Sequence, residues 1–185
     1  KCDWSSDVCS SDLRHQKLVR LFEILDYDNS GTIELSDFEQ AVENVAQLRG
    51  WETTSSDYEL MHSSWVGFGV VLLDLADLDG NGKIEMSEWL ECLEQRLDYD
   101  FSQAFLKLID ANEDGEIAID ELKTFYRAYN IDASAIEEAF DSLDRNLDGH
   151  ISAEEFEKSF AEFIYSDDTQ APGNWLFGVA LPKKL

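Results

Sequence analysis

The chain has 185 residues, of which 44% are hydrophobic, and its 40 acidic and 14 basic side chains give a formal net charge of −26. This apolar fraction is sufficient for a packed core and excludes wholesale disorder. Nucleic acid and anionic membrane surfaces would both repel such a chain, so neither is expected as a partner.

The first residues are expected to lie outside the folded domain. Residues 3–13 read as the translation of a common sequencing-library adaptor, so residues 1–13 are interpreted as an artefactual or disordered tail. Two of the three cysteines, Cys2 and Cys9, fall in this tail, and Cys92 is expected to be a small buried side chain on a helix. The chain thus lacks a disulfide framework, which favours a reducing compartment and a cytoplasmic location.

A first acidic loop follows the first predicted helix. Residues 14–25 carry apolar side chains at helical spacing and lead into the segment Asp26–Asp37, called loop 1. The loop has side-chain oxygens at its first, third and fifth positions and a glycine at its sixth. A second predicted helix, residues 35–48, follows it and is ended by Gly50.

A second loop lies beyond a polar linker, residues 49–57, and a long predicted helix, residues 58–76. The apolar run from Trp65 to Leu73 in this helix is much shorter than the ~20 residues of a membrane span, so no span is expected. The helix leads into loop 2, Asp77–Glu88, which has side-chain oxygens at its first, third, fifth and twelfth positions. Its sixth residue is glycine, which adopts the required positive φ at little steric cost.

The same pattern returns in loop 3, Asp110–Glu121, and in loop 4, Asp144–Glu155. All four loops carry isoleucine at the eighth position, where a short extended segment can pair with a partner loop. These isoleucines are Ile33, Ile84, Ile117 and Ile151. Four unrelated acidic turns would explain neither the aligned glycines nor the aligned isoleucines.

Loops 2 to 4 fit the EF-hand pattern without exception, and such a loop offers Ca²⁺ the about six to eight oxygen ligands that it takes. In loop 2 these come from the side chains of Asp77, Asp79, Asn81 and Glu88 and from the backbone carbonyl of Lys83. The predicted fold class is all-α. It consists of four EF-hands in two pairs that form one compact EF-hand domain, with short paired β segments in the loops.

The domain organisation follows from the loop order. Residues 14–97 are predicted to form the N-terminal EF-hand pair and residues 98–165 the C-terminal pair. Residues 166–185 are predicted to be a tail that packs on the lobes, because Trp175-Leu176-Phe177 is too apolar to remain in water.

With four loops, a widened first pair and a C-terminal Pro172-Gly173-Asn174-Trp175-Leu176-Phe177-Gly178, the chain resembles the sarcoplasmic calcium-binding protein and calexcitin group. The resemblance implies a compact helical protein that buffers Ca²⁺ and Mg²⁺ inside the cell. It also implies ligands at the first, third, fifth, seventh and twelfth positions of every loop. These residues are Asp26, Asp28, Ser30, Thr32, Asp37, Asp77, Asp79, Asn81, Lys83, Glu88, Asp110, Asn112, Asp114, Glu116, Glu121, Asp144, Asn146, Asp148, His150 and Glu155.

Loop 1 departs from the pattern at its twelfth position, where Asp37 replaces glutamate. Aspartate is one methylene shorter, so contact through both of its oxygens is harder and a one-oxygen contact favours Mg²⁺. Loop 1 is therefore predicted to bind Ca²⁺ weakly or to hold Mg²⁺. Glu34, at the ninth position, is a candidate to assist directly or through water.

Three functions are compatible with these loops. A sensor of the calmodulin type exposes a methionine-rich groove, but this chain has 2 Met against 11 Phe, 6 Tyr and 5 Trp. Rigid aromatics favour a closed interior and hence an intracellular Ca²⁺/Mg²⁺ buffer. The alternative is a sensor that binds a partner protein when loaded with Ca²⁺, because aromatic clefts also bind partners. A luciferin-binding or photoprotein-like ligand carrier is the third, with His62 near Trp65 as its cavity histidine.

No catalytic activity is predicted. The sequence has no Ser/His/Asp set, P-loop or Cys/His metal spacing, and the loops account for every regular carboxylate cluster. Calcium ions are the predicted partners, a protein partner is not indicated, and a monomer is expected. Bound cations would offset part of the negative charge, so the metal-free chain is expected to be less stable.

Overall fold

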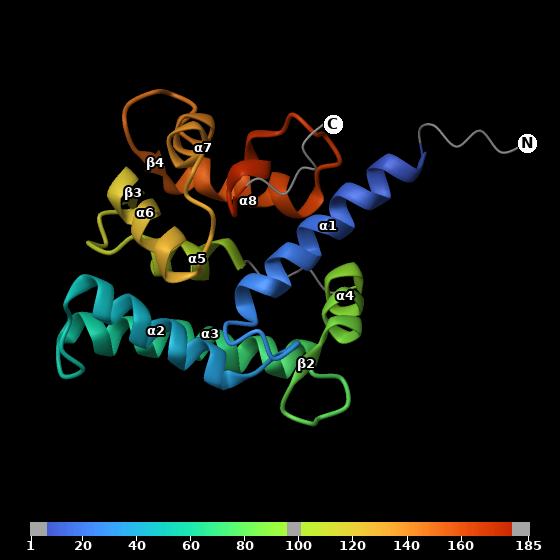
Figure 1. Cartoon of the computed structure of the whole chain (residues 1–185), viewed down its shortest axis with the longest axis horizontal. Coiled ribbons are helices and arrows are strands. Elements are labelled where there is room, and N and C mark those ends of the chain that lie inside the picture. Colours follow the sequence, from blue (N-terminus) through green and yellow to red (C-terminus); the bar gives the residue numbers. More distant parts are fainter. Residues whose placement is uncertain (1–6, 96–100, 179–185) are drawn as a thin grey trace, which may run out of the picture.

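The computed structural model describes residues 7–95 and 101–178 (Figure 1). Within these ranges the chain forms eight α-helices, one 3₁₀-helix and four short strands, which confirms the all-α prediction. The elements in chain order are α1 (Asp7–Leu25), β1 (Thr32–Ile33), α2 (Leu35–Arg49), α3 (Ser56–Ala76), β2 (Ile84–Glu85), α4 (Met86–Gln95), α5 (Phe101–Ile109), β3 (Glu116–Ile117), α6 (Ile119–Ala128), α7 (Ile136–Leu143), β4 (Ile151–Ser152), α8 (Ala153–Tyr165) and the 3₁₀-helix η1 (Pro172–Trp175).

The four strands join the loops in two pairs. β1 pairs with β2 in antiparallel register, with Ile33 opposite Ile84, and β3 pairs with β4, with Ile117 opposite Ile151. All four isoleucine side chains are fully buried. The predicted paired β segments are therefore present, and each one ties two loops together.

Two helices begin earlier than their apolar spacing predicts. α1 begins at Asp7 rather than at residue 14, and the Leu13 side chain is buried. α3 begins at Ser56 rather than at residue 58, because the Ser55 hydroxyl accepts a hydrogen bond from the backbone N–H of Tyr58. Residues 7–13 are thus helical and not a disordered tail. Their artefactual origin stays a prediction.

The two halves of the chain share one hydrophobic core. α1 packs on α8 and on α4 (Figure 1), α2 packs on α6, and α3 packs on α5. At the centre, the Phe105 ring lies 5.1 Å from that of Trp65 and 5.6 Å from that of Phe160. The predicted boundary at residues 97 and 98 lies outside the described residues.

The segment after α8 closes this core. Phe177 is fully buried, with its ring 5.2 Å from Phe105 and 4.9 Å from Phe163. Gly173 lies directly on α8, where an added Cβ would meet the backbone oxygen of Ser159 at 2.2 Å. Only glycine permits this approach.

Among the described residues, no helix combines the length and apolar character needed to cross a membrane.

Candidate metal centres

Each loop turns around the carboxylate of its first residue. The glycine at the sixth position donates its N–H to that carboxylate at 2.8 to 2.9 Å, in the pairs Gly31–Asp26, Gly82–Asp77, Gly115–Asp110 and Gly149–Asp144. The φ angles of these glycines lie between 82° and 92°, in the left-handed region that favours glycine. The sequence pattern therefore corresponds to one repeated backbone geometry.

The third residue of each loop also stabilises the turn. Its side-chain oxygen accepts a hydrogen bond from the backbone N–H two residues further on, at 2.9 to 3.0 Å. These residues are Asp28, Asp79, Asn112 and Asn146. Such side-chain turns hold oxygens on the inner side of a loop without a regular helix or strand.

The twelfth residue closes each loop from the first turn of the following helix. In loop 4, Glu155 accepts from the N–H of Arg145 and from that of Ser152, both at 2.9 Å. In loop 1, the shorter Asp37 accepts from Glu34 at 2.7 Å and from Asp28 at 3.2 Å. Asp37 thus accepts from the third residue of its loop, whereas the longer Glu155 accepts from the second residue as well as from the third, Asn146, at 3.1 Å.

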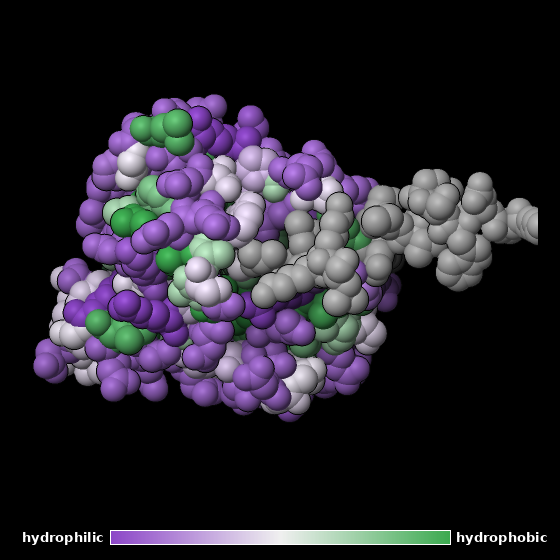
Figure 2. Space-filling view, turned by 45° about the horizontal axis from the view of Figure 1, so that its top comes forward, coloured by the Kyte–Doolittle hydropathy of each residue, from purple (hydrophilic) through white to green (hydrophobic). Residues whose placement is uncertain are grey.

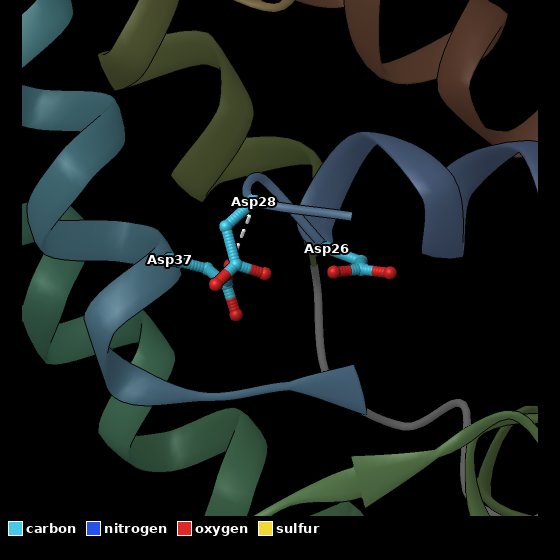
Figure 3. Close-up of side chains that lie close together, drawn as sticks. All are labelled: Asp26, Asp28 and Asp37. Atoms are coloured by element: carbon cyan, nitrogen blue, oxygen red, sulfur yellow. Dashed lines mark hydrogen bonds between the residues drawn. The ribbon is translucent and has the colours of Figure 1, made fainter. Parts of the chain in front are cut away.

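Loop 1 gathers three carboxylates between the end of α1 and the start of α2 (Figure 3). A carboxylate oxygen from each of Asp26, Asp28 and Asp37 lies within 4.8 Å of the others, and Asp26 and Asp37 are buried. Burial is the main cause that raises the pKa of Asp37, and the neighbouring Asp28 and Asp26 carboxylates raise it further. Three acids held this close need a cation to offset their repulsion.

Loop 2 has a second such group, in which oxygens of Asp77, Asp79 and Glu88 lie within 4.8 Å of one another. Loops 3 and 4 have asparagine at the third position and aspartate at the fifth, so their three carboxylates stand at the first, fifth and twelfth positions. In loop 3, Asp110 Oδ1 is buried and has no hydrogen-bond partner among the described residues. A buried carboxylate oxygen without a partner is costly, and a bound cation would satisfy it.

Glu155 of loop 4 differs electrostatically from Asp37. Burial opposes the ionisation of Glu155, but hydrogen bonds from Ser152, Asn146 and Arg145 outweigh it and hold the pKa of this carboxyl below its usual value. The donor sets of all four loops consist of carboxylate, amide, hydroxyl and backbone oxygens, which fit a hard divalent cation.

The side chains at the seventh position of loops 2 to 4 point away from the loop interior. Lys83 Nζ lies 2.7 Å from Glu34 Oε1 of loop 1, and His150 Nδ1 lies 3.8 Å from Glu116 Oε2 across the second strand pair. This leaves only their backbone carbonyls for the loop. Glu34, considered as an accessory ligand, is instead paired with Lys83 and Thr32.

Two residues that the sequence pattern does not mark, one within loop 1 and one near loop 3, connect distant parts of the chain. Tyr27 of loop 1 bonds to Ala128 O at the end of α6, and Arg49 at the end of α2 bonds to Ile109 O just before loop 3. Both contacts join residues far apart in the chain, and neither residue belongs to the repeated pattern, so no local signal identifies them.

Comparison with known proteins agrees with this geometry. The EF hand family model matches residues 18–42, 70–93, 103–126 and 136–161, which together make up more than half of the chain and contain each of the four loops in full. The chain belongs to the EF-hand family. Calcium binding is the property that this membership supports.

One relative matches the EF-hand chain over nearly its whole length. It is the sarcoplasmic calcium-binding protein beta chain of Penaeus sp., which is 26% identical over 190 aligned residues, covering 91% of this chain and 96% of the relative. The resemblance to sarcoplasmic calcium-binding proteins is thus confirmed. This full-length relative is a calcium-binding protein and not an enzyme, in agreement with the prediction of a non-catalytic chain.

Two further comparisons support less, one because it covers only a small part of the relative and the other because its sequence identity is low. Calcium-dependent protein kinase 9 of Arabidopsis thaliana is 32% identical over 145 residues, which cover 76% of this chain but only 24% of the kinase. The coelenterazine-binding protein from Renilla muelleri, in its calcium-loaded apo form, has a TM-score of 0.75 at 18% identity, over 92% of this chain and 97% of that one. At this identity, the likeness extends to the fold alone.

Proposed function

We propose that the chain is a Ca²⁺/Mg²⁺ buffer that holds up to four divalent ions, one in each loop. The proposed ligands are the residues at the first, third, fifth, seventh and twelfth positions, the seventh through its carbonyl. The buried, unpartnered Asp110 Oδ1 and the carboxylate groups of loops 1 and 2 support this assignment. A bound cation would supply positive charge that the acidic loops lack.

The observation that carries the buffer proposal is the closure of the core by Phe177. This ring comes from the C-terminal segment and lies fully buried among the aromatics of α5, α6 and α8. A sensor exposes an apolar surface when the helices of its EF-hands separate. In this chain, such a separation would have to break up the aromatic core that the hands share. The face in Figure 2 agrees, since its hydrophobic residues form small separate patches among hydrophilic ones.

Within this proposal, loop 1 holds Mg²⁺ more readily than the other loops do. Asp37 accepts from the third residue of its loop, where the glutamates reach the second, and it is held among two other aspartates. A shorter carboxylate that offers one oxygen suits the six-coordinate ion. We also place the protein in the cytoplasm, as a monomer, and cell fractionation and sedimentation check these two points.

A sensor is the second candidate, and one surface feature favours it. A groove of about 1250 Å³ lies between the α2–α3 connection and the start of loop 3. Its walls include Leu48 and Leu60, whose side chains are 48% and 50% exposed, and the buried Met61. Apolar side chains in such a groove can receive a partner protein.

A ligand carrier has less support. His62, the histidine considered for a cavity, lies partly exposed on α3 with its ring 5.7 Å from that of Tyr58. Trp65, by contrast, faces the packed aromatic core. The similarity to the coelenterazine-binding protein is one of fold, and purification without a bound chromophore is the expected result.

Dye binding separates the buffer from the sensor. The fluorescence of a dye that binds apolar surfaces is measured on metal-stripped protein, with Mg²⁺ and with Ca²⁺. A buffer predicts a small change or a decrease on Ca²⁺ addition, and a sensor a large increase. Phe177→Ala, which opens the core, is the positive control that shows the dye detects exposed aromatics.

A further inference from the structure

Helices α2 and α6 pack against each other, and each of them leaves one loop and ends near the other. α2 begins beside Asp37 of loop 1 and ends at Arg49. The Arg49 guanidinium donates to the backbone oxygen of Ile109 at 3.2 Å. Because Ile109 directly precedes Asp110, this contact holds the entrance of loop 3.

The second contact joins the end of α6, which leaves loop 3, to loop 1. α6 begins beside Glu121 of loop 3 and ends at Ala128. The Ala128 oxygen accepts from the Tyr27 hydroxyl at 2.9 Å and from Asn44 Nδ2 of α2 at 3.0 Å. Since Tyr27 follows Asp26 directly, the end of α6 is fastened to the second residue of loop 1.

Both contacts are shielded and supported by aromatic rings. The Arg49 guanidinium lies 4.9 Å from the centre of the Trp51 ring, and its charge interacts with those of Glu121 and Asp110. The Tyr27 ring meets that of Tyr129 edge-on at 5.6 Å. Hydrogen bonds between polar groups withdrawn from water in this way are costly to break. The end of α2 therefore moves with loop 3, and the end of α6 moves with loop 1.

We propose that loops 1 and 3 are coupled directly through α2 and α6, so that filling one loop raises the affinity of the other. Arg49 and Tyr27 are the positioning residues of this coupling, which rests on the ligand assignment proposed above. An ion in loop 1 fixes the start of α2 and Tyr27. The ordering of α2 and α6 is then already complete when loop 3 binds its own ion.

This connection is separate from the strand pairs. β1–β2 links loop 1 to loop 2, and β3–β4 links loop 3 to loop 4. Neither sheet joins the first pair of loops to the second. Coupling between loops 1 and 3 therefore reports on the helix contacts, while coupling between loops 1 and 2 serves as an internal reference.

The sixth-position glycines allow each loop to be followed by itself. The N–H of Gly31 and that of Gly115 bond to the first carboxylate of loops 1 and 3, so their amide shifts report the filling of each loop. Metal-stripped ¹⁵N-labelled protein is titrated with Ca²⁺ alone. When loop 3 is disabled by Glu121→Gln, the half-saturation of Gly31 should shift to Ca²⁺ concentrations about fivefold higher or more.

The positioning residues are tested by repeating this comparison in Tyr27→Phe and Arg49→Met. In each background, Glu121→Gln should shift the Ca²⁺ concentration at half-saturation of Gly31 by less than about twofold. The effect of disabling loop 2 with Glu88→Gln should persist. Arg49→Lys, which keeps the charge, is the second variant if Arg49→Met does not give a folded spectrum.

Matched controls come from the same fold. Tyr126 also buries its hydroxyl, which donates to Trp175 O at 2.8 Å, but it ties α6 to the C-terminal segment. Arg14 also donates to a backbone oxygen, that of Ile164 at 3.3 Å, away from both loops. In Tyr126→Phe and Arg14→Met, Glu121→Gln should still shift the half-saturation of Gly31 about fivefold.

Two results would overturn the proposal in distinguishable ways. If Gly31 and Gly115 of the unmodified chain do not respond to Ca²⁺, the ligand assignment fails, and the coupling with it. If they respond but Gly31 ignores the loss of loop 3, or if Tyr27→Phe and Arg49→Met keep the full ratio, the loops bind ions but α2 and α6 do not couple them.

Discussion

Loop 1 and loop 4 share one backbone geometry but differ in the electrostatics of their closing residue. In loop 1, burial and two neighbouring aspartates raise the pKa of Asp37. In loop 4, hydrogen bonds overcome burial and lower the pKa of Glu155. Both loops have three carboxylates at the ligand positions, so the difference lies in the surroundings of the closing residue: they disfavour the ionised form of Asp37 and favour that of Glu155.

The largest expected effect comes from removing the charge of the residue that closes loop 4. Glu155→Gln should lower the Ca²⁺ affinity of loop 4 by more than about 100-fold, because even residues behind metal ligands contribute 10–100-fold. The amide shift of Gly149 measures it. Glu154→Gln is the matched control, since Glu154 is exposed on the same helical turn, and equal effects of the two variants would contradict the ligand role.

Exchanging the two closing residues sharpens the comparison. Asp37→Glu should raise the preference of loop 1 for Ca²⁺ over Mg²⁺ by about tenfold, and Glu155→Asp should lower that of loop 4 similarly. Competition calorimetry with both ions measures the two preferences. If neither preference moves, the length of the twelfth side chain does not select the ion.

The two pKa shifts predict opposite pH responses of the metal-free protein. Because the pKa of Asp37 is raised on folding, its favourable contribution is present at low pH and is lost as the pH rises through the raised value. Because that of Glu155 is lowered, its contribution is present above the ordinary value and is lost as the pH falls through the lowered one.

Asp37→Asn should therefore stabilise the metal-free chain at about pH 7, and Glu155→Gln should destabilise it, with both differences shrinking towards about pH 4. Melting temperatures in the presence of chelator, measured across this range, check the sign. A shift of both variants in the same direction at neutral pH would show that the two loops do not differ in this way.

The smallest effect is expected at the ion pair between loops 1 and 2. Lys83 and Glu34 are in contact at 2.7 Å but partly exposed, with side chains 49% and 31% accessible, and such pairs contribute little. Lys83→Gln should change the melting temperature least of these variants and not at all in concentrated salt. A large, salt-resistant loss would mean that the pair holds the strands together.

The loops could be predicted from the sequence because their determinants are local. The spacing of Asp77, Asp79, Asn81 and Gly82 dictates one turn geometry, and an isoleucine two residues later dictates a short buried strand. The same reasoning placed the helices, with errors at their starts, where Ser55 capped α3 two residues early.

What sequence reasoning missed depends on helix packing. Arg49 reaches Ile109 and Tyr27 reaches Ala128 only because α2 lies on α6, and the spacing of neighbouring residues contains no information about that contact. The close approach of Gly173 to Ser159 is of the same kind. Local chemistry therefore identifies the candidate sites, and tertiary structure determines how they communicate.

The central claim, that four oxygen-lined loops hold divalent ions, is tested most directly by calorimetric titration of metal-stripped protein with Ca²⁺, without and with Mg²⁺. The account predicts four ions per chain, with Mg²⁺ competing most strongly at loop 1, and a melting temperature that falls when chelator is added. A titration without binding heat at any temperature, together with a melting temperature that chelator leaves unchanged, would contradict it.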